Sequence, residues 1–197
     1  MADFRLRVTY AETGRLVMLS HLEIARALER AVRRAGLPYA VSQGFSPHMK
    51  QAFGSALPVG VGGLEEIFDV SLTDYVPPEE ALARLRASSA PDLMPHAARY
   101  ITKDETAASA AYPRSTYEAL LEASRTGDGE MDVLAVAHEL SLPSEITVVR
   151  KKKRVLVPSE FVVGELEVEP AEPGEEGQSR ALVRFTLESK ASGSLRP

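Results

Sequence analysis

The N-terminal half of the chain alternates between two hydrophobic patterns. Residues 4–10 place apolar and polar side chains in turn, and this period of two predicts a half-buried strand. Residues 20–35 change to helical spacing, and Ser20 with Glu23 forms the capping-box sequence that begins a helix. The apolar stripe expected to face the core is Leu22, Ala25, Leu28, Val32 and Ala35.

The elements that follow predict the fold class. Residues 39–53 contain short extended pieces, and residues 66–72 and 93–101 are expected strands. Pro77 and Pro78, followed by two glutamates, predict the start of a second helix. The order is therefore strand, helix, strand, strand, helix, strand. We expect an α+β fold of the ferredoxin-like (βαββαβ) type, an antiparallel sheet with helices on one face.

The length of 197 residues allows two small domains, and the pattern of elements repeats loosely after an Ala-, Thr- and Asp-rich stretch. We expect a ferredoxin-like domain over residues 1–103 and a linker over 104–113. A second ferredoxin-like α+β domain is expected over 114–190, with a flexible tail over 191–197. Whether the chain continues past Pro197 in a longer protein is left open by the sequence.

The composition removes several kinds of chemistry. The chain has no cysteine, which excludes disulfides, thiolate zinc sites and iron–sulfur ligation by this chain. No His-Glu-x-x-His motif or calcium loop occurs, so no metal site is expected. The N-terminus lacks an apolar signal core, and no apolar run approaches the roughly 18 residues that a bilayer requires. We expect a soluble, cytoplasmic protein without a membrane partner.

Two basic patches stand out against a formal net charge of −5. The outer face of the first helix carries four arginines, and a later tract predicted to lie in a hairpin carries five consecutive cations. Both are candidates for nucleic-acid binding. The alternatives are a solvated helix face and a hairpin whose lysines block edge pairing. The residues are Arg26, Arg30, Arg33 and Arg34 in the helix, and Arg150, Lys151, Lys152, Lys153 and Arg154 in the tract.

The segment Ser42–Lys50 gathers further candidate binding residues: Gly44, Phe45, Ser46, His48 and Lys50. An aromatic ring can stack on a base, while a hydroxyl, an imidazole and an ammonium group can bind phosphate. The alternative is a braced connection with the aromatic ring anchored in the core.

Catalysis has only weak candidates in this sequence, His21 and His48. If they converged, they would resemble the acid/base pair of a metal-independent ribonuclease. The sequence does not show whether they converge.

Several motifs together resemble one family, the radical SAM-linked (radical SAM-associated) proteins, a domain of unknown function. They are Leu19-Ser-His-Leu-Glu23, Arg26-Ala-Leu-Glu-Arg30, Arg33-Arg-Ala-Gly-Leu-Pro38, Gly44-Phe-Ser-Pro-His48, Phe53-Gly54, Leu57-Pro58 and Gly60. The close resemblance covers about residues 4–72 and is looser in the second half. Met49 stands where the family usually has a second proline, which implies a less rigid loop. The first half is also similar, in fold pattern, to tandem ferredoxin-like CRISPR repeat-processing endoribonucleases.

The resemblance implies a partner rather than a reaction of this chain. Such domains accompany radical SAM enzymes, so S-adenosylmethionine, an iron–sulfur cluster and cobalamin would belong to the partner and no cofactor to this chain. The leading hypothesis is an RNA-binding accessory module that presents structured RNA to that enzyme for modification or processing. The alternatives are a metal-independent endoribonuclease and a protein-interaction domain that docks the radical SAM partner without RNA. The RNA, the partner's reaction and the oligomeric state are left open.

Overall fold

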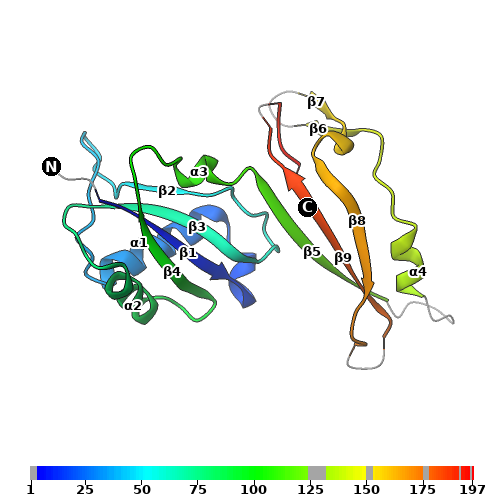
Figure 1. Ribbon diagram of the computed structural model, residues 1–197, viewed down its shortest axis with the longest axis horizontal. Helices are drawn as coiled ribbons and strands as arrows, with labels where there is room; N and C mark the ends of the chain where they lie inside the picture. Colours follow the sequence, from blue (N-terminus) through cyan, green and yellow to red (C-terminus); the bar gives the residue numbers. More distant parts are fainter. Residues whose placement is uncertain (1–3, 124–131, 150–152, 175–177, 191, 196) are drawn as a thin grey trace. The chain divides into compact units, whose positions relative to one another are not determined.

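The computed structural model describes residues 4–123, 132–149, 153–174, 178–190, 192–195 and 197. The chain divides into two compact units, Met1–Tyr112 and Pro113–Pro197 (Figure 1). Each unit builds its own antiparallel sheets.

Unit 1 is a four-stranded sheet with two long helices. Its strands lie in the order β2-β3-β1-β4, and all neighbouring pairs are antiparallel. This is the arrangement of a ferredoxin-like unit, so the predicted α+β class is confirmed. The elements are β1 (Phe4–Glu12), η1 (Gly14–Met18), α1 (His21–Arg34), β2 (Gln51–Phe53), β3 (Gly63–Leu72), α2 (Pro78–Ser88), β4 (Leu93–Ile101) and α3 (Ala108–Ala111).

The core of unit 1 lies between the long helices and one face of the sheet. Leu6, Val8, Phe68, Val70 and Leu72 alternate inward from β1 and β3 and are completely buried. Helix α1 begins where predicted, since the Glu23 carboxylate accepts a hydrogen bond from the Ser20 backbone at 2.8 Å.

The predicted apolar stripe of α1 is wrong at its first turn. Leu22 is 66% exposed, whereas Ile24, which the prediction omitted, is 2% exposed. The buried positions Ile24, Leu28, Ala31 and Val32 are spaced at four, three and one residues, which is one face of a helix. Leu22 lies two positions before this face and therefore points away from it.

The opposite face of the sheet, called the open face below, carries charged side chains. Arg7 and Asp69 are directly paired across β1 and β3 and are 5% and 4% exposed. Their ion pair is bidentate, with Nε to Oδ1 at 2.7 Å and Nη2 to Oδ2 at 3.0 Å. Hydrogen bonding to Asp69 raises the pKa of Arg7, so the guanidinium stays charged.

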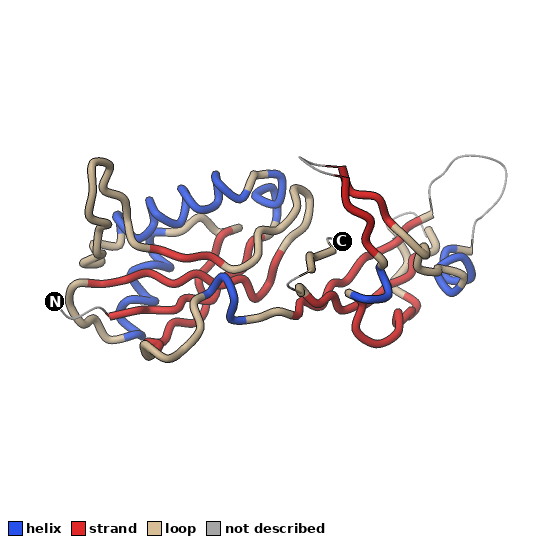
Figure 2. The backbone as a smooth tube through the Cα atoms, turned by 90° about the horizontal axis from the view of Figure 1, so that it is seen from above, coloured by secondary structure: helices blue, strands red, loops and turns tan. Residues whose placement is uncertain are grey.

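A segment after β4, called the strap below and comprising residues 102–111, docks on this ion pair. Arg7 Nη2 donates to the Thr106 carbonyl at 2.7 Å, and the Ala108 backbone donates to Asp69 Oδ2 at 2.8 Å. Arg5 Nη1 also donates to the Glu105 carbonyl at 3.4 Å. Figure 2 shows α3 as a short helical turn on the chain path that leads into β5 (Arg114–Glu122).

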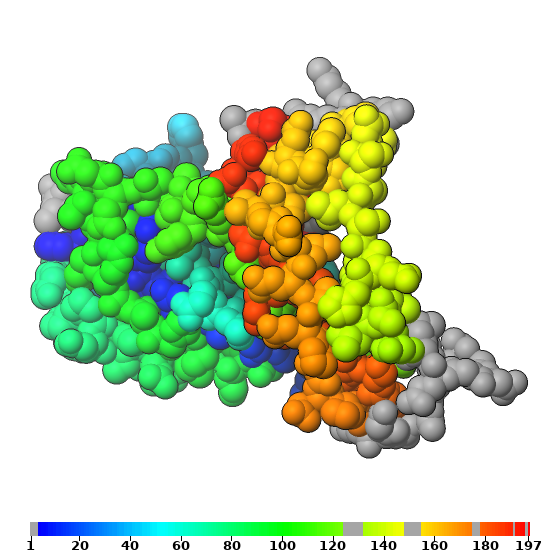
Figure 3. Space-filling model, turned by 45° about the vertical axis from the view of Figure 1, so that its right-hand side comes forward, coloured from blue at the N-terminus to red at the C-terminus, as the bar shows by residue number. Residues whose placement is uncertain are grey.

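The predicted linker over 104–113 is therefore corrected, because residues up to Tyr112 belong to unit 1. Small and polar side chains made the stretch resemble a solvated connection. Its docking uses backbone groups instead, and Ala108 is small enough to be buried against the sheet. In the space-filling view, green atoms of β4 and the residues after it border the blue atoms of β1 (Figure 3).

Unit 2 has a different strand order. Its sheets are β5-β9-β8 and β6-β7, and all pairs are antiparallel. Helix α4 packs Val133 and Ala137 against Ala181 and Val183 of β9. Helix α4 has only six residues, and a short η2 turn precedes β8. The elements after β5 are α4 (Val133–His138), β6 (Ile146–Val149), β7 (Lys153–Leu156), η2 (Pro158–Glu160), β8 (Val162–Pro170) and β9 (Arg180–Glu188).

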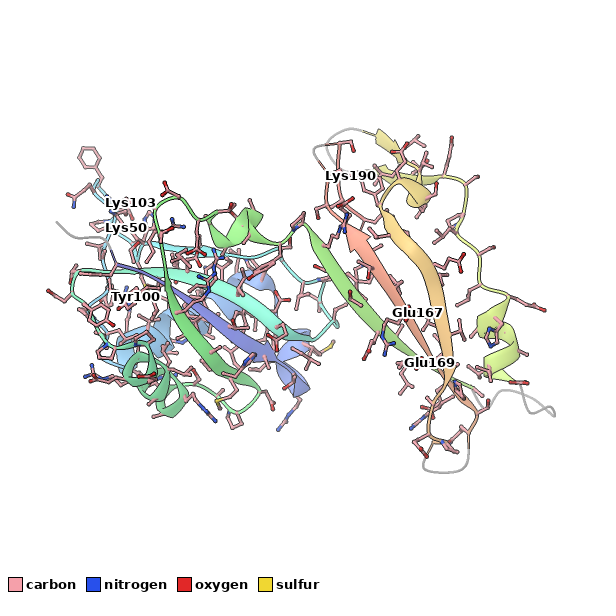
Figure 4. The ribbon with its side chains drawn as sticks, in the orientation of Figure 1. Lys50, Tyr100, Lys103, Glu167, Glu169 and Lys190 are labelled. Carbon is pink, nitrogen blue, oxygen red and sulfur yellow. The ribbon has the colours of Figure 1, made fainter. Side chains whose placement is uncertain are left out.

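Cross-strand ion pairs lie on the face of the β5-β9-β8 sheet that points away from α4. Arg184 bridges Glu118 at 2.9 Å and Glu167 at 3.3 Å, and Glu167 and Glu169 follow one another along β8 (Figure 4). Such exposed pairs contribute little to stability, because solvent screens them. Just beyond β9, Lys190 and Gly193 form an isolated bridge at the start of the predicted tail.

No helix in the described part of the chain has the length and apolar character needed to cross a bilayer.

Substituting Asp69→Asn should destabilise unit 1 by roughly 3–5 kcal/mol, because it leaves the buried Arg7 guanidinium uncompensated. Urea unfolding followed by circular dichroism measures the loss. Asp74→Asn, at an exposed aspartate just after β3, is the control and should change stability by less than about 0.5 kcal/mol. A loss at Asp69 no larger than that of the control would contradict the assigned role of the ion pair.

Candidate nucleic-acid interface

The segment Ser42–Lys50 is a hydrogen-bonded hairpin rather than an irregular loop. Val41 and Met49 form an antiparallel bridge, and the Ser42 backbone donates to the His48 carbonyl at 2.8 Å. At the base, the Lys50 backbone donates to the Ala40 carbonyl at 2.9 Å. Gly44 in the turn has a φ of 136°, a conformation that side-chain-bearing residues rarely adopt. The sequence therefore builds a braced projection at the edge of the sheet.

Phe45 lies in the turn of this hairpin and is completely exposed, at 113% of its reference area. The alternative in which its ring anchors the loop in the core is therefore not what the structure shows. An aromatic side chain buries roughly 150–250 Å² when it packs, so an unpacked ring forgoes a large stabilisation. Its position favours a role in contact with a ligand.

Met49 anchors the hairpin and determines which way its neighbours face. Its side chain is 1% exposed and belongs to the core cluster. Because successive side chains of an extended strand point to opposite faces, His48 and Lys50 are directed toward the open face. Met49, which stands where the similar family usually has a proline, is thus a core residue. Its apolar packing offsets the loss of loop rigidity expected without the proline.

His48 is held by the hairpin itself. Its Nδ1 lies 3.0 Å from Ser42 Oγ and 3.2 Å from the Ser46 carbonyl oxygen. A carbonyl can only accept, so this contact requires the proton on Nδ1. The other ring nitrogen, Nε2, has no hydrogen-bond partner among the residues that the structure describes. The imidazole is oriented with one nitrogen left for solvent or a ligand.

A cavity of about 340 Å³ lies beside the hairpin on the open face. Its floor includes a cross-strand row in which the Ser71 backbone donates to the Lys50 carbonyl at 3.0 Å and Ser71 pairs with Arg5. Lys50 and Lys103 lie at the same end of the sheet (Figure 4). The lining residues are Arg5, His48, Met49, Lys50, Gln51, Ala52, Asp69, Ser71 and Ala107.

The four arginines of α1 divide into two kinds. Arg33 pairs with Glu29 at 2.6 Å and lies 4.9 Å from the Tyr39 ring centroid, and Arg34 Nε donates to the Ser88 carbonyl at 3.2 Å. These two brace the helix within unit 1. Arg26 and Arg30 are exposed and form no ion pair with any residue in the described ranges.

The predicted basic tract falls largely outside the described residues. Arg150, Lys151 and Lys152 are not described, and Lys153 and Arg154 are described only as backbone of β7. The tract remains a prediction.

The two candidate catalytic histidines are not brought together. His21 packs edge-on against Phe53 with ring centroids 5.4 Å apart, and Phe53 stacks on the core residue Phe68. His21 therefore lies on the helix side of the sheet, whereas His48 lines the cavity on the open face. In addition, no cluster of three or more potential metal-ligating side chains occurs within the described ranges.

An acidic pair near the end of β1, formed by the buried Glu12 and the half-buried Glu66, was not predicted from the sequence. Burial raises the pKa of Glu66 from 4.5 to about 7, and the nearby Glu12 carboxylate raises it further. Burial also raises the pKa of Glu12, and burial with both carboxylates raises the pKa of Tyr10. Glu12 lies at the end of β1, at a position that the alternating pattern directs toward the core. This position was the one indication in the sequence that the Glu12 carboxyl is buried.

Arg5 and Ser71, which line the cavity, were not predicted as site residues, nor was Lys103, which lies at the same end of the sheet as Lys50. Arg5 and Ser71 occupy the outward positions of predicted strands, and such positions are ordinarily solvated. The pairing register, which places them side by side, is not visible in the sequence.

A family model for uncharacterized proteins conserved in bacteria matches residues 5–197 and so spans both units. A search of curated proteins gives no match to the chain. The family description names no RNA, nuclease or radical SAM enzyme. The comparison therefore shows membership of an uncharacterized bacterial family. The resemblance to radical SAM-linked proteins and to CRISPR endoribonucleases stays a prediction.

Substituting Glu66→Gln should stabilise unit 1 above pH 7, by on the order of 2 kcal/mol. A carboxyl with a raised folded-state pKa contributes its full stability below the unfolded value near 4.5 and loses it as pH rises through about 7. The variant should therefore flatten the fall in stability between these pH values. Urea midpoints measured across the range test this, with exposed Glu65→Gln as the matched control. Equal pH profiles for wild type and the Glu66 variant would contradict the burial of this carboxyl.

Proposed function

The chain belongs to the DUF2344 family of bacterial proteins, and we propose that it is an RNA-binding module whose unit 1 contacts RNA through the Ser42–Lys50 hairpin. The observation that carries the proposal is the fully exposed Phe45 ring in the turn of a hydrogen-bonded hairpin. His48 and Lys50 face the cavity beside the same turn. An aromatic ring beside cationic and hydrogen-bonding groups is the combination that binds single-stranded nucleotides.

The hairpin supplies a stacking platform that is already ordered before binding. Its backbone hydrogen bonds and the buried Met49 side chain restrict the turn, so less conformational entropy is lost when a base stacks on Phe45. Base stacking on one aromatic ring is worth roughly 1–3 kcal/mol and tolerates any base. We therefore expect the protein to select RNA by its shape and by single-stranded regions, rather than by a fixed base sequence.

Local positive charge supports RNA binding despite the net charge of −5. Lys50 and Lys103 lie at one end of the sheet. Arg26 and Arg30 extend from α1, which covers the face opposite the cavity, and have no ion-pair partners among the described residues. Local cations of this kind neutralise phosphates and release counterions, so affinity should fall steeply with salt.

We further propose that the module works beside a radical SAM enzyme, as the motif resemblance implies. The absence of cysteine means that this chain cannot itself ligate an iron–sulfur cluster, so that chemistry would reside in the partner. Co-purification of the two proteins after nuclease treatment tests direct contact. Loss of the complex on nuclease treatment would mean that RNA, and not a protein interface, joins them.

The endoribonuclease alternative gains no support from the positions of its two histidines. An acid/base pair must reach the same scissile phosphate, and His21 and His48 lie on different sides of the sheet. Incubation of the protein with structured RNA in EDTA should leave the RNA intact. Cleavage abolished by His48→Ala would overturn this view and make the chain an enzyme.

Electrophoretic titration with a transfer RNA transcript tests RNA binding directly. Phe45→Ala should weaken binding by roughly 5- to 150-fold, which corresponds to the loss of one stacked base. Leu64→Ala removes another exposed apolar side chain, outside the hairpin, and should bind as wild type does.

Salt provides the second arm of this test. Raising it from about 50 to 200 mM should weaken wild-type binding strongly if phosphates are neutralised. Absence of binding at the lower concentration, or equal affinities for the Phe45 variant and wild type, would rule out the proposed interface.

A further inference from the structure

We propose that the cavity beside the hairpin binds the terminal phosphate monoester of an RNA strand. The inference deepens the proposed function, since it names the chemical group that this same surface selects. Three features support it: the charge of the lining, the donors that meet there and the size of the cavity.

The charge of the lining matches a dianion. Asp69 is the one acidic residue that lines the cavity, and Arg7 already neutralises it through the bidentate pair. Arg5 also lies 3.5 Å from Asp69, but Arg5, Arg7 and Lys50 together exceed this one carboxylate by two positive charges. A phosphate monoester carries about −1.5 to −2 charges at pH 7, whereas an internal phosphodiester carries one.

The donors that line the cavity converge from three strand segments. Lys50 comes from the base of the hairpin, Ser71 from β3 and Arg5 from β1, and they are consecutive neighbours in one cross-strand row. His48 adds an imidazole whose Nε2 has no partner among the described residues. An ammonium group, a guanidinium, a hydroxyl and an imidazole together can surround the oxygens of a tetrahedral anion.

Arg5 is held in place for this role by the strap. It lies 3.5 Å from Asp69 Oδ2 and donates to the carbonyl of Glu105 at 3.4 Å. Ala107 of the strap closes one wall of the cavity. The volume of about 340 Å³ is at the small end of ligand sites, which run from roughly 300 to 1,000 Å³, and admits one terminal nucleotide rather than a duplex.

The test compares one short single-stranded RNA carrying a 5′-phosphate, a 3′-phosphate or hydroxyls at both ends, titrated by fluorescence anisotropy. One of the phosphorylated forms should bind about tenfold more tightly than the hydroxyl form, because it gains charge-assisted hydrogen bonds. Lys50→Gln and His48→Gln should each remove this preference. Lys190→Gln, at a lysine in unit 2, should retain it. Equal affinity for all three RNA forms would overturn the terminal-phosphate site while leaving RNA binding intact.

A second measurement separates this inference from the proposed function. Adenosine 5′-monophosphate and adenosine 3′-monophosphate, compared with adenosine by calorimetry, report on the cavity without a polymer. Binding of a monophosphate in the absence of RNA binding would support the phosphate site and overturn the RNA-binding proposal. Failure of wild type to distinguish either monophosphate from adenosine would overturn the site, even if the variants proved unfolded.

Discussion

The buried ion pair between Arg7 and Asp69 is the constraint on which the open face of unit 1 depends. The two side chains are buried on a sheet face that carries no long helix, so each must find partners there. The strap provides them, through the Thr106 carbonyl and the Ala108 backbone amide. Once the strap is docked, its residue Ala107 forms a wall of the cavity, and Arg5 is held between Asp69 and Glu105. The Arg7–Asp69 ion pair thus determines, through the strap, the shape of the cavity on the open face.

The alternation of side chains around Met49 connects this surface to the hairpin. Burial of Met49 in the helix-side core requires His48 and Lys50 to face the opposite direction. The same strand parity sends Phe53 to the helix side, where it packs with His21 and Phe68. Strand parity therefore directs His48 to the cavity on the open face, whereas His21 packs with Phe53 on the helix side.

Periodicity predicted much of the fold because the strands and helices of unit 1 bury one regular face each. The strand at residues 93–101 has the expected bounds, and the second helix begins where Pro77 and Pro78 predicted. The residue types of Ser42–Lys50 made this segment a candidate site, but the hairpin that it forms was not predicted. Its fully exposed ring was not predicted, because an aromatic side chain packs inside as readily as it projects. The strap was missed because it docks on Arg7 and Asp69 through its own backbone groups, which the pattern of side chains does not show. The contacts of Arg33 with Tyr39 and of Arg34 with Ser88 form only in the folded chain, and the role of both arginines in binding stays a prediction.

The most direct test of the account uses the absence of tryptophan from the chain. A Phe45→Trp variant carries a single indole at the turn of the hairpin, so its emission reports on that position alone. If bases stack there, titration with RNA should quench the emission to saturation, and added salt should reverse the change. Emission that stays constant while the same RNA binds would contradict the central claim that the hairpin is the RNA-contacting element.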